Sequence, residues 1–185
     1  MSQLIVHAGD FTFQARFEEQ LAPKTCAAFR RAMPFESQAI HVRWSGEGVW
    51  MPLGDLDFGV SYENHTSYPA PGQIILYPGG ISETEILLAY GGVHFASKMG
   101  QLAGNHFITL TSNLENLPAL GKAVLWKGAQ KVRFEVALNG GSKVPSRSPR
   151  LWPQPARSAL AGRGQGRRPV RGEFRGGWRK QHSAR

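Results

Sequence analysis

Hydrophobic and polar residues alternate with a period of two along several parts of the chain, the pattern of strands with one buried face. Residues 11–17 show it clearly, and residues 4–8, turned back at Gly9 and Asp10, would form the other half of a hairpin. The remaining predicted strands lie in residues 39–45, 49–53, 73–77, 86–90, 106–111 and 131–138. About eight short strands with many Gly and Pro turns, and no alternation with helices, favour a mainly β barrel.

The segment from residue 39 to residue 53 predicts two strands joined by a glycine-rich turn. Its alternation places Ile40, Val42 and Trp44 on one face and His41 and Arg43 on the other. Pro52 would end the second strand or confine it to a sheet edge, because proline cannot donate a ladder hydrogen bond.

Two short helices are expected beside these strands. Residues 22–32 are rich in alanine and carry proline at a plausible first position and arginines in the last turn. Ser112 and Glu115 have capping-box spacing, which predicts a following helix with Leu114, Leu117 and Leu120 on one side. Pro118 and Gly121 would disturb this second helix.

The charge is divided unevenly along the 185 residues. Residues 1–140 hold ten Lys and Arg against twelve Asp and Glu, a net charge of −2, whereas residues 141–185 hold twelve against one, a net charge of +11. The second segment, rich in Arg, Gly and Pro, is predicted to be a disordered tail. Its arginines and aromatics suit contact with nucleic acid. Alternatively it is a run-on extension past a natural end near residue 138.

Composition excludes several other classes for the first 140 residues. One cysteine allows no intramolecular disulfide and no Cys-rich zinc site. No secretory signal and no apolar run near the ~20 residues of a membrane span is present, so we expect a soluble, cytoplasmic protein. The slightly acidic domain needs no polyanionic partner, and exposed strand edges favour a homodimer.

Carboxylates and imidazoles supply the first candidate chemistry. Glu83 and Glu85 are two residues apart, so on a strand they share a face, where they can bind a cation or perturb each other's ionisation. The alternative is a solvated surface. His94 and His106 could join them as metal ligands, but the spacing matches no metal signature, and ordinary hydrogen-bonded histidines are favoured. We predict no metal and no cofactor.

Aromatic residues and one arginine supply the second candidate chemistry. Arg43 with Trp44 and Trp50 could form a wall that pairs a carboxylate, although packing is the more usual role of tryptophan. His65 lies in a long polar loop, residues 54–72, of a length that is often functional. The predicted ligand-binding residues are Arg43, Trp44, His65, Tyr77, Glu83, Glu85, His94 and His106. Together they suggest a small-molecule pocket in the barrel.

Several motifs resemble those of cyclophilins. Ala22-Pro23-Lys24-Thr25, with Phe29 at the same spacing, is similar to a cyclophilin helix start, and residues 104–108 resemble the cyclophilin run Gly-Ser-Gln-Phe-Phe. Residues 33–37, residues 44–47, Trp50 and the Tyr77-Pro78 step resemble a family of small bacterial cyclophilin-like proteins of unassigned function. The resemblance spans residues 2–138 and implies a closed cyclophilin-like barrel.

The residues of prolyl isomerisation are not matched. Where cyclophilins have Phe-His-Arg-Val, the chain has Ile-His-Val-Arg, so Arg43 comes one position late. Pro52 and His106 replace two glutamines of the family. Our leading hypothesis is therefore that the protein binds or transforms a small carboxylate- or amide-bearing metabolite. The alternatives are a peptidyl-prolyl isomerase of weak or altered activity and nucleic-acid contact through the basic tail. The sequence does not decide whether the protein is an enzyme.

Overall fold

A computed structural model describes residues 2–138. The predictions about the tail of residues 141–185 therefore lie outside the described part of the chain. The helices are α1 (Pro23–Arg31), the short 3-10 helix η1 (Leu114–Asn116) and α2 (Leu117–Trp126). The strands are β1 (Ser2–Ala8), β2 (Phe11–Phe17), β3 (Phe35–His41), β4 (Gly46–Gly54), β5 (His65–Thr66), β6 (Gln73–Tyr77), β7 (Thr84–Val93), β8 (Ala96–Ser97), β9 (Gly100–Gln101), β10 (Gly104–Leu110) and β11 (Gln130–Leu138).

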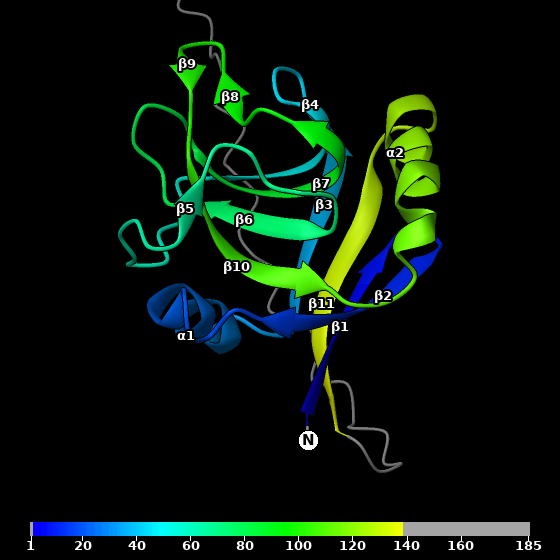
Figure 1. Ribbon diagram of the computed structural model, residues 1–185, viewed down its shortest axis with the longest axis horizontal. Helices are drawn as coiled ribbons and strands as arrows, with labels where there is room; N and C mark the ends of the chain where they lie inside the picture. Colours follow the sequence, from blue (N-terminus) through cyan, green and yellow to red (C-terminus); the bar gives the residue numbers. More distant parts are fainter. Residues whose placement is uncertain (1, 139–185) are drawn as a thin grey trace, which may run out of the picture. The chain divides into compact units, whose positions relative to one another are not determined.

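Eight antiparallel strands close into a barrel, as the alternation predicts. They are hydrogen-bonded in the order β2-β1-β11-β3-β4-β7-β6-β10, and β10 pairs again with β2. The short strand β5 adds to β10, and β8 and β9 form a separate hairpin (Figure 1). No helix within residues 2–138 is long and apolar enough to cross a membrane.

The inward residues of the strands fill the barrel completely with side chains. Phe29 of α1 lies at the centre of an aromatic group, with ring centroids 5.1 Å from Phe35, 5.0 Å from Phe107 and 5.1 Å from Phe134. The helices α1 and α2 lie on opposite sides of the barrel and both contribute to this core (Figure 1). These side chains form the main core of the barrel, and a small-molecule pocket there stays a prediction from the sequence.

A second apolar cluster lies on the outer face of β4, β7 and β6. In β6, Ile74 and Leu76 point inward while Ile75 and Tyr77 point outward. The outward side chains are covered by the segment from Val93 to Leu102, which includes the β8–β9 hairpin. These strands are therefore buried on both faces near their middles, which explains their continuous apolar sequence.

The path from β3 to β4 differs from the prediction. Strand β3 starts at Phe35 and ends at His41, so Val42 and Trp44 are not strand positions, and Trp44 is 60% exposed. Strand β4 continues past Pro52 to Gly54, so the proline does not end the strand but stands at a locally unpaired edge of it. Proline is tolerated because β3 pairs only with Val49 and Trp50, which leaves a single neighbouring strand beside Pro52.

The predicted capping box before α2 is also wrong. The hydroxyl of Ser112 accepts a hydrogen bond from the backbone N–H of Gln14 at 2.9 Å and caps no helix. Pro118 stands in the first turn of α2, where it begins the helix rather than disturbing it. Gly121 is required by packing, because a Cβ there would lie 2.4 Å from the ring of Tyr90.

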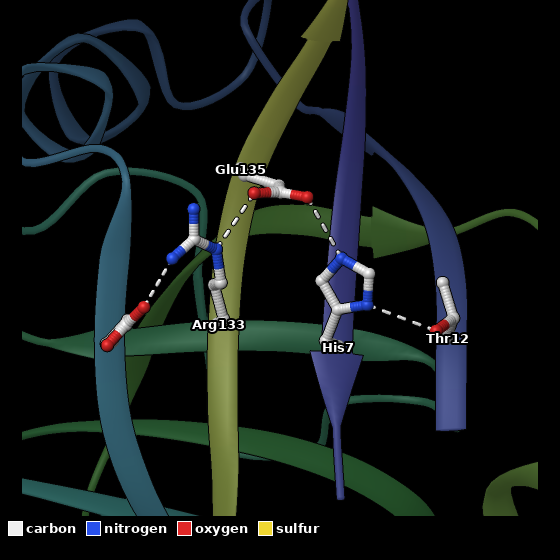
Figure 2. A network of polar contacts seen from close by, with 5 residues as sticks. His7, Thr12, Arg133 and Glu135 are labelled. Atoms are coloured by element: carbon white, nitrogen blue, oxygen red, sulfur yellow. Dashed lines mark hydrogen bonds and ion pairs between the residues drawn. The ribbon is translucent and has the colours of Figure 1, made fainter. Parts of the chain in front are cut away.

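A polar network crosses the outer surface of four strands away from the second cluster (Figure 2). His7 contacts Thr12 and Glu135 at 3.1 Å each, and Arg133 donates to Glu135 at 2.8 Å and also to Glu36. Its side chains are more than one-third exposed, so each pair contributes about 1 kcal/mol or less to stability.

Candidate functional site

Three side chains of the outer face meet where β4, β7 and β6 run side by side. Glu85 of β7 is paired with Tyr77 of β6 on one side and with Pro52 of β4 on the other. Trp50 stands two residues before Pro52, so it lies on the same face diagonally from Glu85. Trp50 and Tyr77 both belong to the second apolar cluster, which places the Glu85 carboxyl at its border.

Glu85 is an unusual carboxyl, because it is only 7% exposed and forms no ion pair within residues 2–138. Burial raises the pKa of Glu85 from 4.5 to about 7, and the charge of Glu83 raises it further in the same direction. Glu83 itself is exposed and accepts a hydrogen bond from the backbone N–H of Gly54 at 2.9 Å. The charge of Glu83 therefore perturbs the ionisation of Glu85, an influence that their spacing predicts.

Trp50 provides a donor that lacks a partner. Its Nε1 is buried and donates no hydrogen bond to any described residue. The indole is close enough to Glu85 to lower the pKa of that carboxyl slightly, against the larger effect of burial, but it does not reach hydrogen-bond geometry. A buried donor without a hydrogen-bond partner among the described residues thus lies beside the Glu85 carboxyl, and such donors are rare unless water or a ligand satisfies them.

Aromatic rings surround these two groups. The ring of Tyr62 lies 6.4 Å from that of Tyr77 and 5.4 Å from that of His65, and Tyr77 packs edge-on against Phe95 at 6.0 Å. Burial raises the pKa of Tyr62, and the neighbouring hydroxyl of Tyr77 raises it further. His65 is thus connected to the site through Tyr62, although its own side chain is exposed.

Arg43 and Trp44 lie in the turn between β3 and β4. The guanidinium of Arg43 lies over the Trp50 ring, 5.5 Å from its centroid, and both Arg43 and Trp44 are exposed. Arg43 forms no ion pair with Glu85 within the described residues. Trp50 therefore has a cationic group over its ring and an acidic residue beside it on the neighbouring strand.

His94 and His106 contact other side chains. The Nε2 atom of His94 lies 3.0 Å from Gln101, and its ring stacks on Tyr68 at 4.9 Å. The Nε2 atom of His106 contacts Thr109 at 2.9 Å, and burial lowers its pKa. That both imidazoles line one cavity with the glutamates stays a prediction from the sequence.

Metal binding has no support in the described residues. Residues 2–138 contain no group of three or more His, Cys, Asp or Glu side chains placed to hold a metal ion. His94 and His106 are instead hydrogen-bonded to neutral side chains, the arrangement that the sequence analysis favoured for them.

The polar loop before β5 performs a structural task that the sequence did not reveal. Glu63 accepts a hydrogen bond from the backbone N–H of Thr25 at 2.5 Å, which caps the start of α1 from a distant segment. Asn105 is fully buried, accepts from the backbone N–H of Glu63 and donates to the Thr25 hydroxyl and to Ser61. The two motifs that resemble cyclophilins, around Thr25 and Asn105, are thus joined directly.

The position of Trp50 relative to Glu85 is the feature that sequence reasoning missed. The alternation around Val49 and Met51 could have indicated that Trp50 points outward. Its proximity to Glu85, however, depends on the pairing of β4 with β7, which a local pattern does not determine.

A comparison with models of protein families identifies the family of the chain. Residues 4–136 match the model of a family described as "Protein of unknown function (DUF3830)". The chain belongs to this family. The assignment from the sequence to a cyclophilin-like family of unassigned function is confirmed by this DUF3830 match. A comparison with curated proteins gives no significant match.

Solved structures agree on the fold. The structure of McbB in complex with tryptophan is similar over 83% of this chain, with a TM-score of 0.58 and 16% identity, and the match spans half the length of McbB. The solution structure of the hypothetical protein AF2241 from Archaeoglobus fulgidus matches 73% of this chain and 94% of its own, with a TM-score of 0.50 and 18% identity. The structure of a cyclophilin-type peptidyl-prolyl cis-trans isomerase from Cryptosporidium parvum, in the presence of the dipeptide Ala-Pro, matches 75% of this chain and 99% of its own. Its TM-score is 0.47 and its identity is 10%. At these identities the likeness concerns the fold alone.

Proposed function

We propose that this DUF3830 protein binds a small carboxylate- or amide-bearing metabolite on the outer face of β4, β7 and β6. The observation that carries the proposal is the buried Nε1 of Trp50, a donor that no described residue satisfies, beside the carboxyl of Glu85, a residue that is only 7% exposed. Leaving such a donor unpaired costs roughly 1–3 kcal/mol, so a ligand that pairs it recovers that free energy on binding.

The chemistry of the two groups selects the ligand class. Trp50 Nε1 donates to an oxygen, and an amide or carboxylate provides one. Glu85, when ionised, accepts a hydrogen bond from a ligand N–H. Arg43 is exposed over the indole, can move aside to admit a ligand, and offers a guanidinium that pairs a carboxylate in its preferred geometry. Tyr77 and Tyr62 supply the apolar, aromatic surroundings that small-molecule sites usually have.

Further support comes from the structural neighbour McbB, whose structure contains tryptophan, a small molecule that carries a carboxylate. Trp44, Glu83 and His65, which the sequence predicts as ligand-binding residues, are included in this proposal. His94 and His106, which the sequence included, are not part of this proposal because their side chains lie with other partners.

A thermal-shift and calorimetric screen of amino acids, amides and simple carboxylates, including L-tryptophan, tests the proposal on the full chain. We expect a bound compound to raise the melting temperature, because ligand that binds only the folded state stabilises it. Trp50→Phe, which keeps an aromatic ring but removes the donor, should weaken binding about tenfold. Glu115→Gln, an exposed change remote from the site, is the control. Equal affinity of the Trp50→Phe variant would refute this placement.

Peptidyl-prolyl isomerase activity is the second function that the family resemblance implies, and it stays a prediction. A proline-peptide isomerisation assay with Arg43→Ala as its control tests it, and no acceleration at high protein concentration would remove it. A homodimer, a bacterial and cytoplasmic setting, and nucleic-acid contact through residues 141–185 are likewise predictions from the sequence alone.

A further inference from the structure

We propose that the ligand of this site carries a protonated amine, which binds the Glu85 carboxylate between Trp50 and Tyr77. The inference rests on the proposed function and narrows it. The ligand would combine an ammonium group with a carboxylate or an amide, as an amino acid or an amino-acid amide does.

The charges around the site favour a cation at Glu85. Glu83 and Glu85 both bring negative charge to this edge of the sheet, and neither forms an ion pair within residues 2–138. An amide N–H would leave this charge uncompensated, whereas an ammonium group neutralises it and donates up to three hydrogen bonds. The titratable groups that face Glu85 from neighbouring elements, Tyr77 of β6 and Tyr62 of the loop, provide no cation of their own.

The aromatic rings favour the same ligand group. Trp50 and Tyr77 stand on the two strands that flank Glu85, and the face of an aromatic ring attracts a cation. The Trp50 ring already holds the guanidinium of Arg43 at 5.5 Å, so the indole is accessible to a cation in this fold.

The positions of Arg43 and Glu85 divide the ligand into two ends. Arg43 lies over the indole and forms no ion pair with Glu85, which stands beside Trp50 on the neighbouring strand, so a positive and a negative protein charge both adjoin Trp50. A zwitterionic ligand across Trp50 would place its carboxylate at Arg43 and its ammonium at Glu85, and the indole Nε1 would pair with an oxygen between them.

Calorimetric titration of the full chain with matched pairs tests this inference. Each pair contains a free amino acid and its N-acetyl form, with aliphatic and aromatic side chains represented. We expect the free amino acid to bind about tenfold to a hundredfold more tightly than its N-acetyl partner at pH 8, since a hydrogen bond between charged groups is lost on acetylation. Glu85→Gln should abolish this preference, and Glu115→Gln should retain it.

Proton release provides a second readout that a merely structural role of Glu85 would not produce. At pH 6 most Glu85 carboxyls are protonated in the free protein, so binding an ammonium should release nearly one proton, and at pH 8 almost none. Comparing binding heats at each pH in two buffers that both buffer at that pH, but differ in ionisation enthalpy, measures the number released.

Three results would overturn the inference. Equal or tighter binding of the N-acetyl compounds, binding of uncharged amides alone, or the absence of proton release at pH 6 would each show that Glu85 does not receive a cation. Binding of compounds without the predicted preference for an ammonium group would remove this inference alone. If none of the compounds binds, the proposed function fails as well.

Discussion

The buried carboxyl of Glu85 makes a sharp prediction about stability. Its pKa is about 7 in the folded protein and 4.5 ordinarily, so the folded state binds the proton more tightly than the unfolded chain does. The stabilising contribution is fully present below the unfolded pKa and is lost as the pH rises through the folded pKa. A shift of this size corresponds to about 3 kcal/mol, of which about 2.5 kcal/mol falls between pH 5 and pH 8.

Glu85→Gln isolates this contribution, because glutamine has nearly the same shape and stays neutral at every pH. At pH 5 the variant and the wild type should differ by less than about 1 kcal/mol, since both carry a neutral side chain there. At pH 8 the variant should be more stable by about 2–3 kcal/mol, because only the wild type must bury a charge or take up a proton.

Urea unfolding of the full chain at pH 5, 6, 7 and 8 measures both free energies of unfolding. Glu115→Gln, which removes an exposed charge, should follow the wild type at every pH. A difference between Glu85→Gln and wild type that does not change with pH would refute the reasoning, because it would mean that Glu85 has the same pKa in the folded and unfolded states.

Three further substitutions test the packing and the polar contacts of the barrel. Gly121→Ala should destabilise the protein by about 1–3 kcal/mol in urea unfolding, because the added methyl meets the Tyr90 ring. Asn105→Ala should cost about 3 kcal/mol or more in the same measurement, since it leaves several buried hydrogen-bonding groups unpaired. Arg133→Ala should cost less than about 1 kcal/mol near pH 7. Arg133 lowers the pKa of Glu135, so that stabilisation is present above the usual glutamate pKa and lost in acid, and the variant should lose less stability between pH 6 and pH 3.

Much of the barrel could be predicted from the sequence because local alternation records which face of a strand is buried. The β1–β2 hairpin, the strand at residues 73–77 and the inward side chains of Val132 and Phe134 follow this pattern. The errors occur where a distant partner outweighs a local signal. Ser112 binds the backbone of Gln14, almost a hundred residues away, instead of capping a helix.

The candidate site was predictable only in part, for a related reason. The influence of Glu83 on the ionisation of Glu85 follows from a spacing of two. Bringing Trp50 beside Glu85 requires the register of β4 on β7, and placing His106 requires the irregularity of β10 between His106 and Ile108. Neither feature is visible in a local pattern, since both are set by non-local pairing.

The central claim is that a ligand pairs with Trp50 Nε1 beside Glu85, and the indole N–H signals of the protein report on it directly. The chain contains five tryptophans, and Trp50→Phe identifies the signal of residue 50 in a ¹H–¹⁵N spectrum of the labelled protein. On titration with the best-binding amino acid, we predict that the Trp50 signal moves with the largest change and that Glu85→Gln suppresses the movement. A ligand that shifts the signal of Trp126 on α2 while that of Trp50 stays fixed would contradict the account.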